Sequence, residues 1–148
     1  MIGVSLGLVV AGCGGSSSKL TLKVASNADL KRSIVVDADG RSLYMFAQDT
    51  GGKATCVGNA PAPSCGKIWP PLVAQGKLQV GTGIDQKLLG TTKRSDGKTQ
   101  VTYNKHPLYY FAGYGGTRGD KKAGDIQGQA FFGVWFVVSP KGAQITQQ

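Results

Sequence analysis

Leu43-Tyr44-Met45-Phe46-Ala47 returns later in the chain as Leu108-Tyr109-Tyr110-Phe111-Ala112, and this repetition decides the fold. A strand-like segment and a turn precede each copy. A tryptophan follows each copy at nearly the same distance, Trp69 in the first half and Trp135 in the second. Each half is therefore expected to form a hairpin, a variable loop and a Trp-led segment. Because a lone two-stranded hairpin is only marginally stable in water, we expect the two halves to pack on each other.

The residues around the repeat favour strands and tight turns, because aromatic and β-branched residues suit strands and Asp-Gly pairs suit turns. The expected strands cover residues 33–36, 42–46, 88–94, 99–103, 107–111 and 130–138, and the turns cover residues 37–40, 95–98 and 104–106. A short helix is expected at residues 84–88, and Pro70-Pro71 ends any regular element after Trp69. The expected fold class is mostly β: a single small domain of two pseudo-symmetric hairpin repeats, antiparallel and packed together.

The composition agrees with this fold and limits the partners. The 148 residues suffice for one domain with its own core, and 41% of them are hydrophobic. There are 23 glycines, and all 8 acidic residues are Asp, which suits turns rather than helices. The formal net charge of +9 suits anionic envelope components as partners, but the favoured interpretation is an ordinary solvated surface. Nucleic acid is not expected, because the basic residues form no long run and no nucleic-acid-binding motif is present.

The N-terminal residues resemble an export signal. The stretch 2–11 is apolar but too short to span a bilayer, which needs about 20 residues. Val10-Ala11-Gly12-Cys13 then resembles a lipobox, in which the cysteine is acylated and becomes the first mature residue. The alternative is an ordinary export signal with an unrelated cysteine. The expected organisation is a signal peptide at 1–12, lipidated Cys13 with a flexible tether over 13–21, the β domain at 22–142 and a tail at 143–148. The protein would then be extracytoplasmic and lipid-anchored to the bacterial membrane.

Cys56 and Cys65 remain as an even pair. In an exported protein such a pair is expected to form a disulfide. The loop between them is polar and rich in Pro and Gly, so a bridge would supply order that packing cannot. A metal site is the weaker alternative, because the spacing is not Cys-x-x-Cys and the single histidine, His106, is distant in sequence.

These features together resemble a known family. Residues 37–49 read Asp-Ala-Asp-Gly-Arg-Ser-Leu-Tyr-Met-Phe-Ala-Gln-Asp, and residues 106–113 read His-Pro-Leu-Tyr-Tyr-Phe-Ala-Gly. With the cysteine pair and the tryptophans, they resemble the secreted-repeat bacterial lipoproteins of unknown function, which have a Tyr-x4-Asp motif. The resemblance covers about residues 30–140 and implies export, lipidation and the repeat, but no reaction. Tyr114 stands where the second copy of that motif has Asp, so an activity that needs both acids is not expected here.

Four residues are candidates for ligand binding: Tyr44, Asp49, Tyr109 and His106. Phenol and acid groups near a strand end can line a polar groove. The alternative is structural, with Asp49 accepting N–H groups of its loop and the aromatic rings forming core. We favour the structural role for the four rings Phe46, Phe111, Trp69 and Trp135. His106 is expected as an exposed turn residue, and its alternative role is an iron or metal ligand beside a tyrosine.

The sequence favours a non-enzymatic function. It contains no nucleophile elbow, phosphate-binding loop or zinc-protease motif, so no catalytic residue is expected. Turn chemistry explains Asp37 and Asp39, while Asp120 and Asp125 are expected to be solvated in a Gly/Lys loop. The expected function is an exported, membrane-anchored lipoprotein with a binding or structural role in the cell envelope. The alternative is a haem- or metal-binding or redox lipoprotein, although the sequence identifies no particular metal or cofactor.

Overall fold

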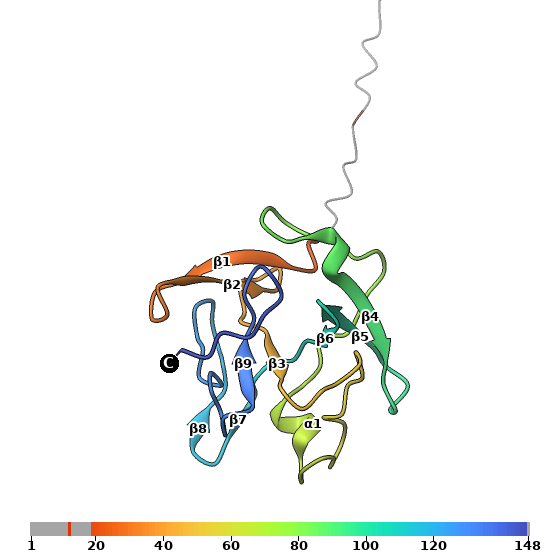
Figure 1. Ribbon diagram of the computed structural model, residues 1–148, viewed down its shortest axis with the longest axis vertical. Helices are drawn as coiled ribbons and strands as arrows, with labels where there is room; N and C mark the ends of the chain where they lie inside the picture. The colour runs from red at the N-terminus through yellow and green to blue at the C-terminus, as the bar shows by residue number, and fades with distance from the viewer. Residues whose placement is uncertain (1–11, 13–18, 148) are drawn as a thin grey trace, which may run out of the picture.

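The computed structural model describes residue 12 and residues 19–147 (Figure 1). The expected signal and lipidation site at Cys13 therefore lie outside the described residues. The described elements, in chain order, are β1 (Lys23–Asn27), β2 (Arg32–Val36), β3 (Tyr44–Phe46), α1 (Cys65–Ile68), the 3-10 turn η1 (Gln86–Leu88), β4 (Leu89–Lys93), β5 (Thr99–Tyr103), β6 (His106–Pro107), β7 (Gly113–Tyr114), β8 (Thr117–Arg118) and β9 (Trp135–Val137). Within this part of the chain, no helix has the length and apolar character needed to cross a membrane.

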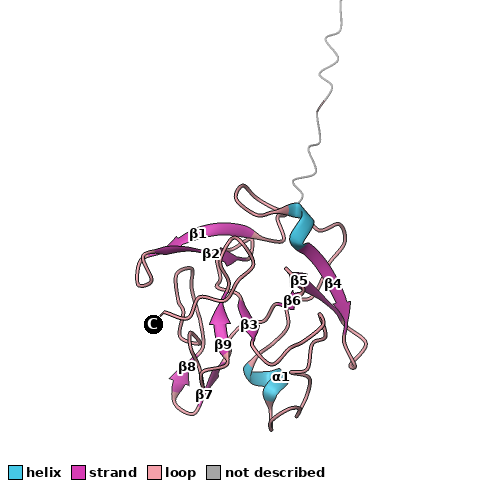
Figure 2. Ribbon diagram, viewed as in Figure 1, coloured by secondary structure: helices cyan, strands magenta, loops and turns pink. Residues whose placement is uncertain are grey.

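The strands form small antiparallel sheets, and most of the remaining chain is turn and loop (Figure 2). β1 pairs with β2, β3 with β9, and β7 with β8, while β4, β5 and β6 form a three-stranded sheet. The β1–β2 ribbon lies across one end of the molecule, β3 and β9 run through its centre, and β4–β6 flank them (Figure 1). The expected fold class, a small and mostly β domain of antiparallel hairpins, is confirmed.

The two repeats meet at their tyrosines. The Tyr44 N–H donates to the Tyr109 carbonyl at 2.9 Å, and the Tyr109 N–H donates to the Tyr44 carbonyl at 2.9 Å. These reciprocal bonds relate the two copies as a pseudo-two-fold pair. In addition, β3 of the first repeat pairs in register with β9 of the second, Met45 opposite Phe136. The halves are therefore interlocked through the backbone as well as packed.

Strand alternation divides the core between two clusters, as expected for a period of two residues. Tyr44 and Phe46 point to the cluster that also holds the two tryptophans. Leu43 and Met45 point to the opposite cluster. Trp69 and Trp135 stack with their ring centroids 3.8 Å apart and their planes 3° apart. The tryptophans that follow the two copies therefore meet face to face in the core.

The expected pairing of strands 33–36 and 42–46 is wrong. Only Val36 and Ser42 form an antiparallel bridge there. The turn between them is held by Asp37, whose Oδ1 accepts the N–H groups of Asp39 and Arg41 at 2.9 Å. Before that turn, β2 pairs with β1, which was not expected. After the turn, β3 pairs with β9. Burial of β3 between two repeats therefore takes precedence over its local hairpin.

Three other expected elements are shorter in the structure. Of the strand expected at 130–138, only β9 forms, because residues 130 and 132–134 are in turns, where Ala130 has φ 57° and Phe132 has φ 50°. Of 107–111, only Pro107 lies in a strand, although Tyr109 bridges to Tyr44 and to Pro71. The short helix expected at 84–88 is the 3-10 turn η1. The helix α1 was not expected.

Candidate functional site

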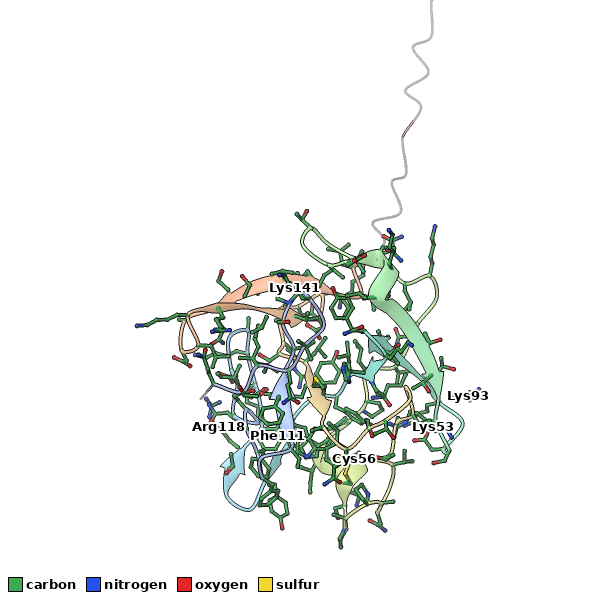
Figure 3. The ribbon with its side chains drawn as sticks, in the orientation of Figure 1. Lys53, Cys56, Lys93, Phe111, Arg118 and Lys141 are labelled. Atoms are coloured by element: carbon green, nitrogen blue, oxygen red, sulfur yellow. A yellow bond between two sulfur atoms is a disulfide. The ribbon has the colours of Figure 1, made fainter. Side chains whose placement is uncertain are left out.

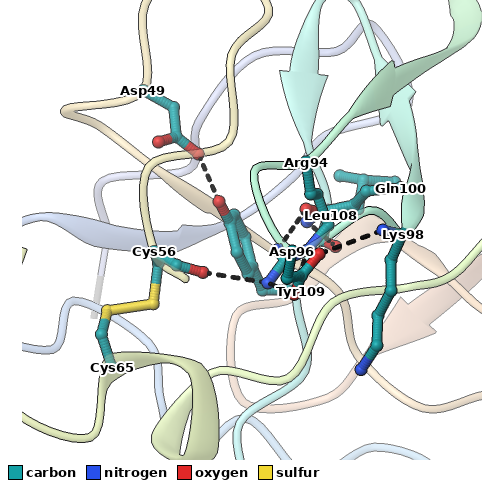
Figure 4. A network of polar contacts seen from close by, with 9 residues as sticks. All are labelled: Asp49, Cys56, Cys65, Arg94, Asp96, Lys98, Gln100, Leu108 and Tyr109. Atoms are coloured by element: carbon teal, nitrogen blue, oxygen red, sulfur yellow. Dashed lines mark hydrogen bonds and ion pairs between the residues drawn. A yellow bond between two sulfur atoms is a disulfide. The ribbon is translucent and has the colours of Figure 1, made fainter. Parts of the chain in front are cut away.

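Two buried tyrosine–aspartate pairs lie at the junction of the repeats. The Tyr109 hydroxyl donates to Asp49 Oδ2 at 2.7 Å, and the Tyr44 hydroxyl donates to Asp120 Oδ2 at 2.6 Å (Figure 4 shows the first pair). Both tyrosines have no exposed surface. Each pair takes its phenol from one repeat and its acid from the other. The two residues of the Tyr44–Asp49 motif therefore belong to different pairs.

Backbone groups complete both pairs in a similar way. Asp49 Oδ1 accepts the Thr55 N–H at 2.9 Å, and Asp120 Oδ1 accepts the Gln127 N–H at 2.8 Å. The Gly128 N–H donates to the Tyr44 hydroxyl at 3.2 Å. A side chain at Gly128 is excluded, because a Cβ there would lie 2.7 Å from the Trp69 ring. All these groups are satisfied by protein partners.

Burial governs the protonation of these pairs. It raises the pKa of Asp49 and of Asp120, although the hydrogen bonds they accept oppose the shift. Burial, followed by the charge of the paired carboxylate, raises the pKa of Tyr44 and of Tyr109. The tyrosine in each pair therefore keeps its proton at neutral pH and acts as the donor.

The second acid expected to be missing is supplied by Asp120. Tyr114, at the motif position, lies in β7 and is 49% exposed, whereas Asp120 is 4% exposed and bonds to Tyr44. The expectation that Asp120 and Asp125 are solvated is wrong, because both are buried. Asp125 Oδ2 accepts the Lys121 N–H at 2.9 Å and so folds the loop back on itself. The available sequence signal was the repeat itself, which calls for a second acid to match Asp49.

His106 does not belong to the turn in which it was expected. The turn consists of Asn104 and Lys105, with φ values of 49° and 64°, and His106 lies in β6 opposite Tyr103. Its side chain is partly buried, and burial lowers the pKa of the imidazole while the charge of Asp49 opposes that shift. His106 is thus a strand residue beside the Tyr109–Asp49 pair.

The described residues bring no cluster of metal-ligating side chains together. Among the residues that the structure describes, no group of three or more His, Cys, Asp or Glu side chains could hold a metal ion. The hydroxyls of Tyr44 and Tyr109 already donate to carboxylates. Direct ligand binding by Tyr44, Asp49, Tyr109 or His106 stays a prediction, since three of these side chains lie in the interior and bond to protein groups.

The expected disulfide is present. Cys56 and Cys65 are joined by an S–S bond of 2.04 Å, and both are buried. Arg94, whose side chain is 2% exposed, reaches this loop through the Cys56 carbonyl at 3.4 Å. Its guanidinium also bonds to Asp96 at 3.1 Å and to Gln100 at 2.6 Å (Figure 4). The second repeat therefore holds the disulfide loop of the first.

A separate aromatic pocket opens on the surface near α1 and β7. Its volume is about 600 Å³. Its floor and walls include the stacked tryptophans together with Phe46, Cys65, Ile68, Phe131 and Val134, and its rim includes Gln48, Pro61, Ala62, Pro63, Ser64, Tyr114 and Phe132. No acidic or basic residue lines it. We name this feature the aromatic pocket; it was not predicted from the sequence.

The rim of the aromatic pocket exposes two rings. Phe132 is 76% exposed and Tyr114 is 49% exposed, and their centroids lie 5.9 Å apart. Phe132 has φ 50° and precedes Gly133 with φ 68°. A bulky side chain at positive φ is strained. The backbone at Phe132 therefore adopts an unfavourable conformation that leaves the ring exposed to solvent.

A second cavity, of about 450 Å³, is lined by both polar and apolar side chains, and several of its polar groups are paired with one another. Lys19 and Asp39, which line it, form an ion pair at 3.0 Å. Asp37 Oδ2 accepts the Tyr110 hydroxyl at 2.9 Å. Its charged groups therefore have partners within the protein, which makes the aromatic pocket the stronger candidate of these two for a binding site.

Comparison with known proteins identifies a family but no reaction. No characterised protein and no solved structure gave a significant match. The model of the family described as "Secreted repeat of unknown function" matches residues 31–73 and 90–139, one match for each repeat. This family and the Cys56–Cys65 disulfide both indicate a location outside the cytoplasm. The chain belongs to the secreted-repeat family of unknown function.

Proposed function

We propose that this protein is an exported lipoprotein, anchored to the bacterial membrane through Cys13, whose domain is a non-enzymatic binding module of the cell envelope. The observation that carries the binding role is the aromatic pocket, whose rim holds Phe132 76% exposed in a strained conformation. Large exposed apolar features on a folded domain commonly mark interaction sites. Membership of a secreted family and the disulfide support export.

The placement of the chemical groups supports a non-enzymatic role. The buried phenols and acids bond to one another and to the backbone. The residues lining the aromatic pocket include no acid, histidine or lysine that could act as a general acid or base. Its cysteine, Cys65, is held in the disulfide. Apart from the Tyr114 phenol at its rim, the aromatic pocket offers no titratable side chain suited to proton transfer, which fits a binding role better than a catalytic one.

The basic surface supports attraction to anionic envelope components. The formal net charge is +9, and Figure 3 shows Lys53, Lys93 and Arg118 toward the edges of the domain, whereas the buried Phe111 lies further inside. Such a field acts at long range and is screened by salt, with a Debye length of about 8 Å at physiological ionic strength. This attraction would draw the domain toward anionic envelope components, but it would not by itself select a particular ligand.

Anchoring is tested by changing Cys13. We expect Cys13→Ser to move the protein from the membrane pellet to the soluble fraction, because the acyl chains that hold it would be lost. Ser17→Ala, a change of similar size within the same Gly/Ser stretch, should leave the protein in the pellet. Retention of Cys13→Ser in the pellet would contradict a lipid anchor.

The binding role is tested by photocrosslinking in cells. A benzophenone side chain placed at Phe132 should yield reproducible adducts in the envelope. Lys87, which is exposed in η1 at the end of the domain remote from α1 and β7, is the control position (Figure 1). Absence of adducts at Phe132, or equal adducts at both positions, would contradict a binding site at the aromatic pocket.

A further inference from the structure

We propose that the aromatic pocket binds an uncharged small molecule with a flat, predominantly apolar ring system. This inference rests on the proposed binding role and specifies the ligand. A volume of about 600 Å³ lies within the range of pockets that enclose small molecules, about 300–1,000 Å³. It is lined mainly by aromatic and aliphatic side chains, with few polar groups.

The absence of charge in the lining selects against ions. The chain contains 17 Lys and Arg residues and 8 acidic residues, yet none of them lines the aromatic pocket. A charged ligand would lose hydration on entry and gain no partner charge. The polar side chains available are those of Gln48, Ser64 and Tyr114, which could orient a ligand through a few hydrogen bonds.

The ring geometry suits a flat guest. The Phe131 and Phe132 rings lie 4.6 Å apart with their planes at 71°, and the Tyr114 and Phe131 planes meet at 85°. Phe131 in turn meets Trp69 edge to face at 5.9 Å. All four rings line the aromatic pocket and stand at steep angles to one another. Another aromatic ring can therefore pack there by offset stacking and edge-to-face contact together.

The backbone of the rim favours a functional role for Phe132. Gly has no Cβ and adopts positive φ without strain, so it would be the relaxed residue at φ 50°. Because the ring is 76% exposed, its burial contributes little free energy to offset the cost of that strain. Strained residues of this kind concentrate at ligand-binding sites. Phe132 thus carries its ring for contact with something outside the chain.

The position of the pocket leaves it open in an anchored protein. The described chain enters the domain at Lys19, at the end opposite α1 and β7 (Figure 1). One wall, Pro61 to Ser64, is tied to the core through the Cys65 disulfide. The aromatic pocket therefore faces away from the point of tethering and has a fixed wall, which keeps it ready for a ligand.

The test uses a matched pair of fluorescent probes on the purified, disulfide-intact protein. N-phenylnaphthylamine is uncharged, and anilinonaphthalenesulfonate carries nearly the same rings with a sulfonate. We expect saturable binding of the uncharged probe and about tenfold weaker binding of the sulfonate. The net charge of +9 would by itself favour the sulfonate, so tighter sulfonate binding would overturn the inference.

Three variants test whether the probe binds in the aromatic pocket. Phe132→Gly and Tyr114→Asp should each weaken binding of N-phenylnaphthylamine by about tenfold, the first by removing a ring and the second by adding a charge. Val73→Ala, at an exposed apolar residue outside this pocket, should bind as the wild type does. Phe132→Gly should also keep or raise the unfolding midpoint, because it relieves the strained φ. Unchanged affinity in both pocket variants would overturn the inference.

The two proposals fail in different ways. If Phe132 crosslinks in cells but the uncharged probe does not bind, the binding role stands and the ligand class is wrong. If neither occurs, both proposals are wrong. A crosslink to a protein at Phe132, together with failure of the probe, would identify a macromolecular partner and exclude the small apolar ligand.

Discussion

Tyr109 and Asp49 show how single residues join the two repeats. The phenol has no exposed surface, and its hydroxyl donates to a carboxylate that also accepts the Thr55 N–H. A buried carboxylate is tolerable only while its donors remain. The same holds for Tyr44 and Asp120. Loss of one donor therefore costs more than the hydrogen bond itself, because the acceptor cannot regain water.

Removal of one hydroxyl tests this reasoning. We expect Tyr109→Phe to lower the free energy of unfolding by about 1–3 kcal/mol, because Asp49 loses a donor in the interior. Tyr110→Phe, at the neighbouring, partly exposed tyrosine that bonds to Asp37, should cost less, because water can replace the lost group. Denaturant unfolding of the two variants measures the difference. Equal losses would contradict a special role for the buried pair.

The raised pKa of Asp49 makes a separate prediction about pH. Because burial raises this pKa in the folded state, folding favours the protonated acid, and that contribution is lost as pH rises from the unfolded value of about 3.9 through the folded pKa. The destabilisation caused by Asp49→Asn should therefore be larger at about pH 4 than at about pH 7. Urea unfolding across this range measures it, with the exposed Asp29→Asn as control. A loss that grows with pH would show the opposite shift.

At the scale of elements, the loop closed by Cys56 and Cys65 forms one wall of the aromatic pocket. Its residues between the cysteines are mostly exposed and contribute little to the core. The bridge and the Arg94 contact to the Cys56 carbonyl hold this loop in place. The order of the pocket wall therefore depends on a covalent bond more than on packing.

Removing the bridge tests that dependence. The double variant Cys56→Ala/Cys65→Ala should unfold about 2–3 kcal/mol more easily, the value expected for a loop of this length. It should also bind N-phenylnaphthylamine more weakly, because the wall would no longer be fixed. The wild-type protein treated with reductant should match the variant in both measurements. A stable variant with unchanged probe binding would show that packing alone orders the wall.

The elements that the sequence predicts well are those whose cause is local. The turn at 95–98 and the strands beside it depend on an Asp-Gly pair and flanking β-formers, and β4 and β5 form there. β1 reads Lys-Val-Ala-Ser-Asn, a weak strand signal, and it forms because β2 offers an edge. The pairing of β3 with β9 is likewise a long-range choice that no local pattern encodes.

The candidate site likewise has features that could be predicted from the sequence and features that could not. Tyr44, Asp49 and Tyr109 could be named from the repeat, and the Cys56–Cys65 bridge from its even count, but the exchange of acids between repeats could not. Asp120 carries no local mark of burial, because it lies in a loop rich in Gly and Lys. The aromatic pocket was missed because its lining comes from four separate stretches of the chain, which only the tertiary fold brings together.

At the scale of the whole molecule, the repeats are not independent units. β3 needs β9, Val35 donates to the Val138 carbonyl at 2.8 Å, and both tyrosine–aspartate pairs cross between halves. The core clusters likewise draw residues from both repeats. When one half is absent, the other is expected to expose strand edges without partners, together with polar groups that are buried in the intact domain.

Separate expression of the halves tests this interdependence. Fragments 19–82 and 83–148 should each lack a dispersed amide spectrum, because neither contains a complete tyrosine–aspartate pair. An equimolar mixture should recover the dispersion of the intact domain if the disulfide is formed in the first fragment. A native-like spectrum from either fragment alone would show that a single repeat suffices.

The crossed pairing of Tyr44 with Asp120 and of Tyr109 with Asp49 also limits which substitutions each repeat can tolerate. A duplicated gene segment usually frees one copy to drift while the other is kept. Here a change in the acid of either copy removes a partner from the tyrosine of the other copy, so neither copy can change at these positions without cost to the other. The copies differ at the position of Asp49, where the second copy has the exposed Tyr114 at the rim of the aromatic pocket, and its acid, Asp120, lies six residues further along the chain.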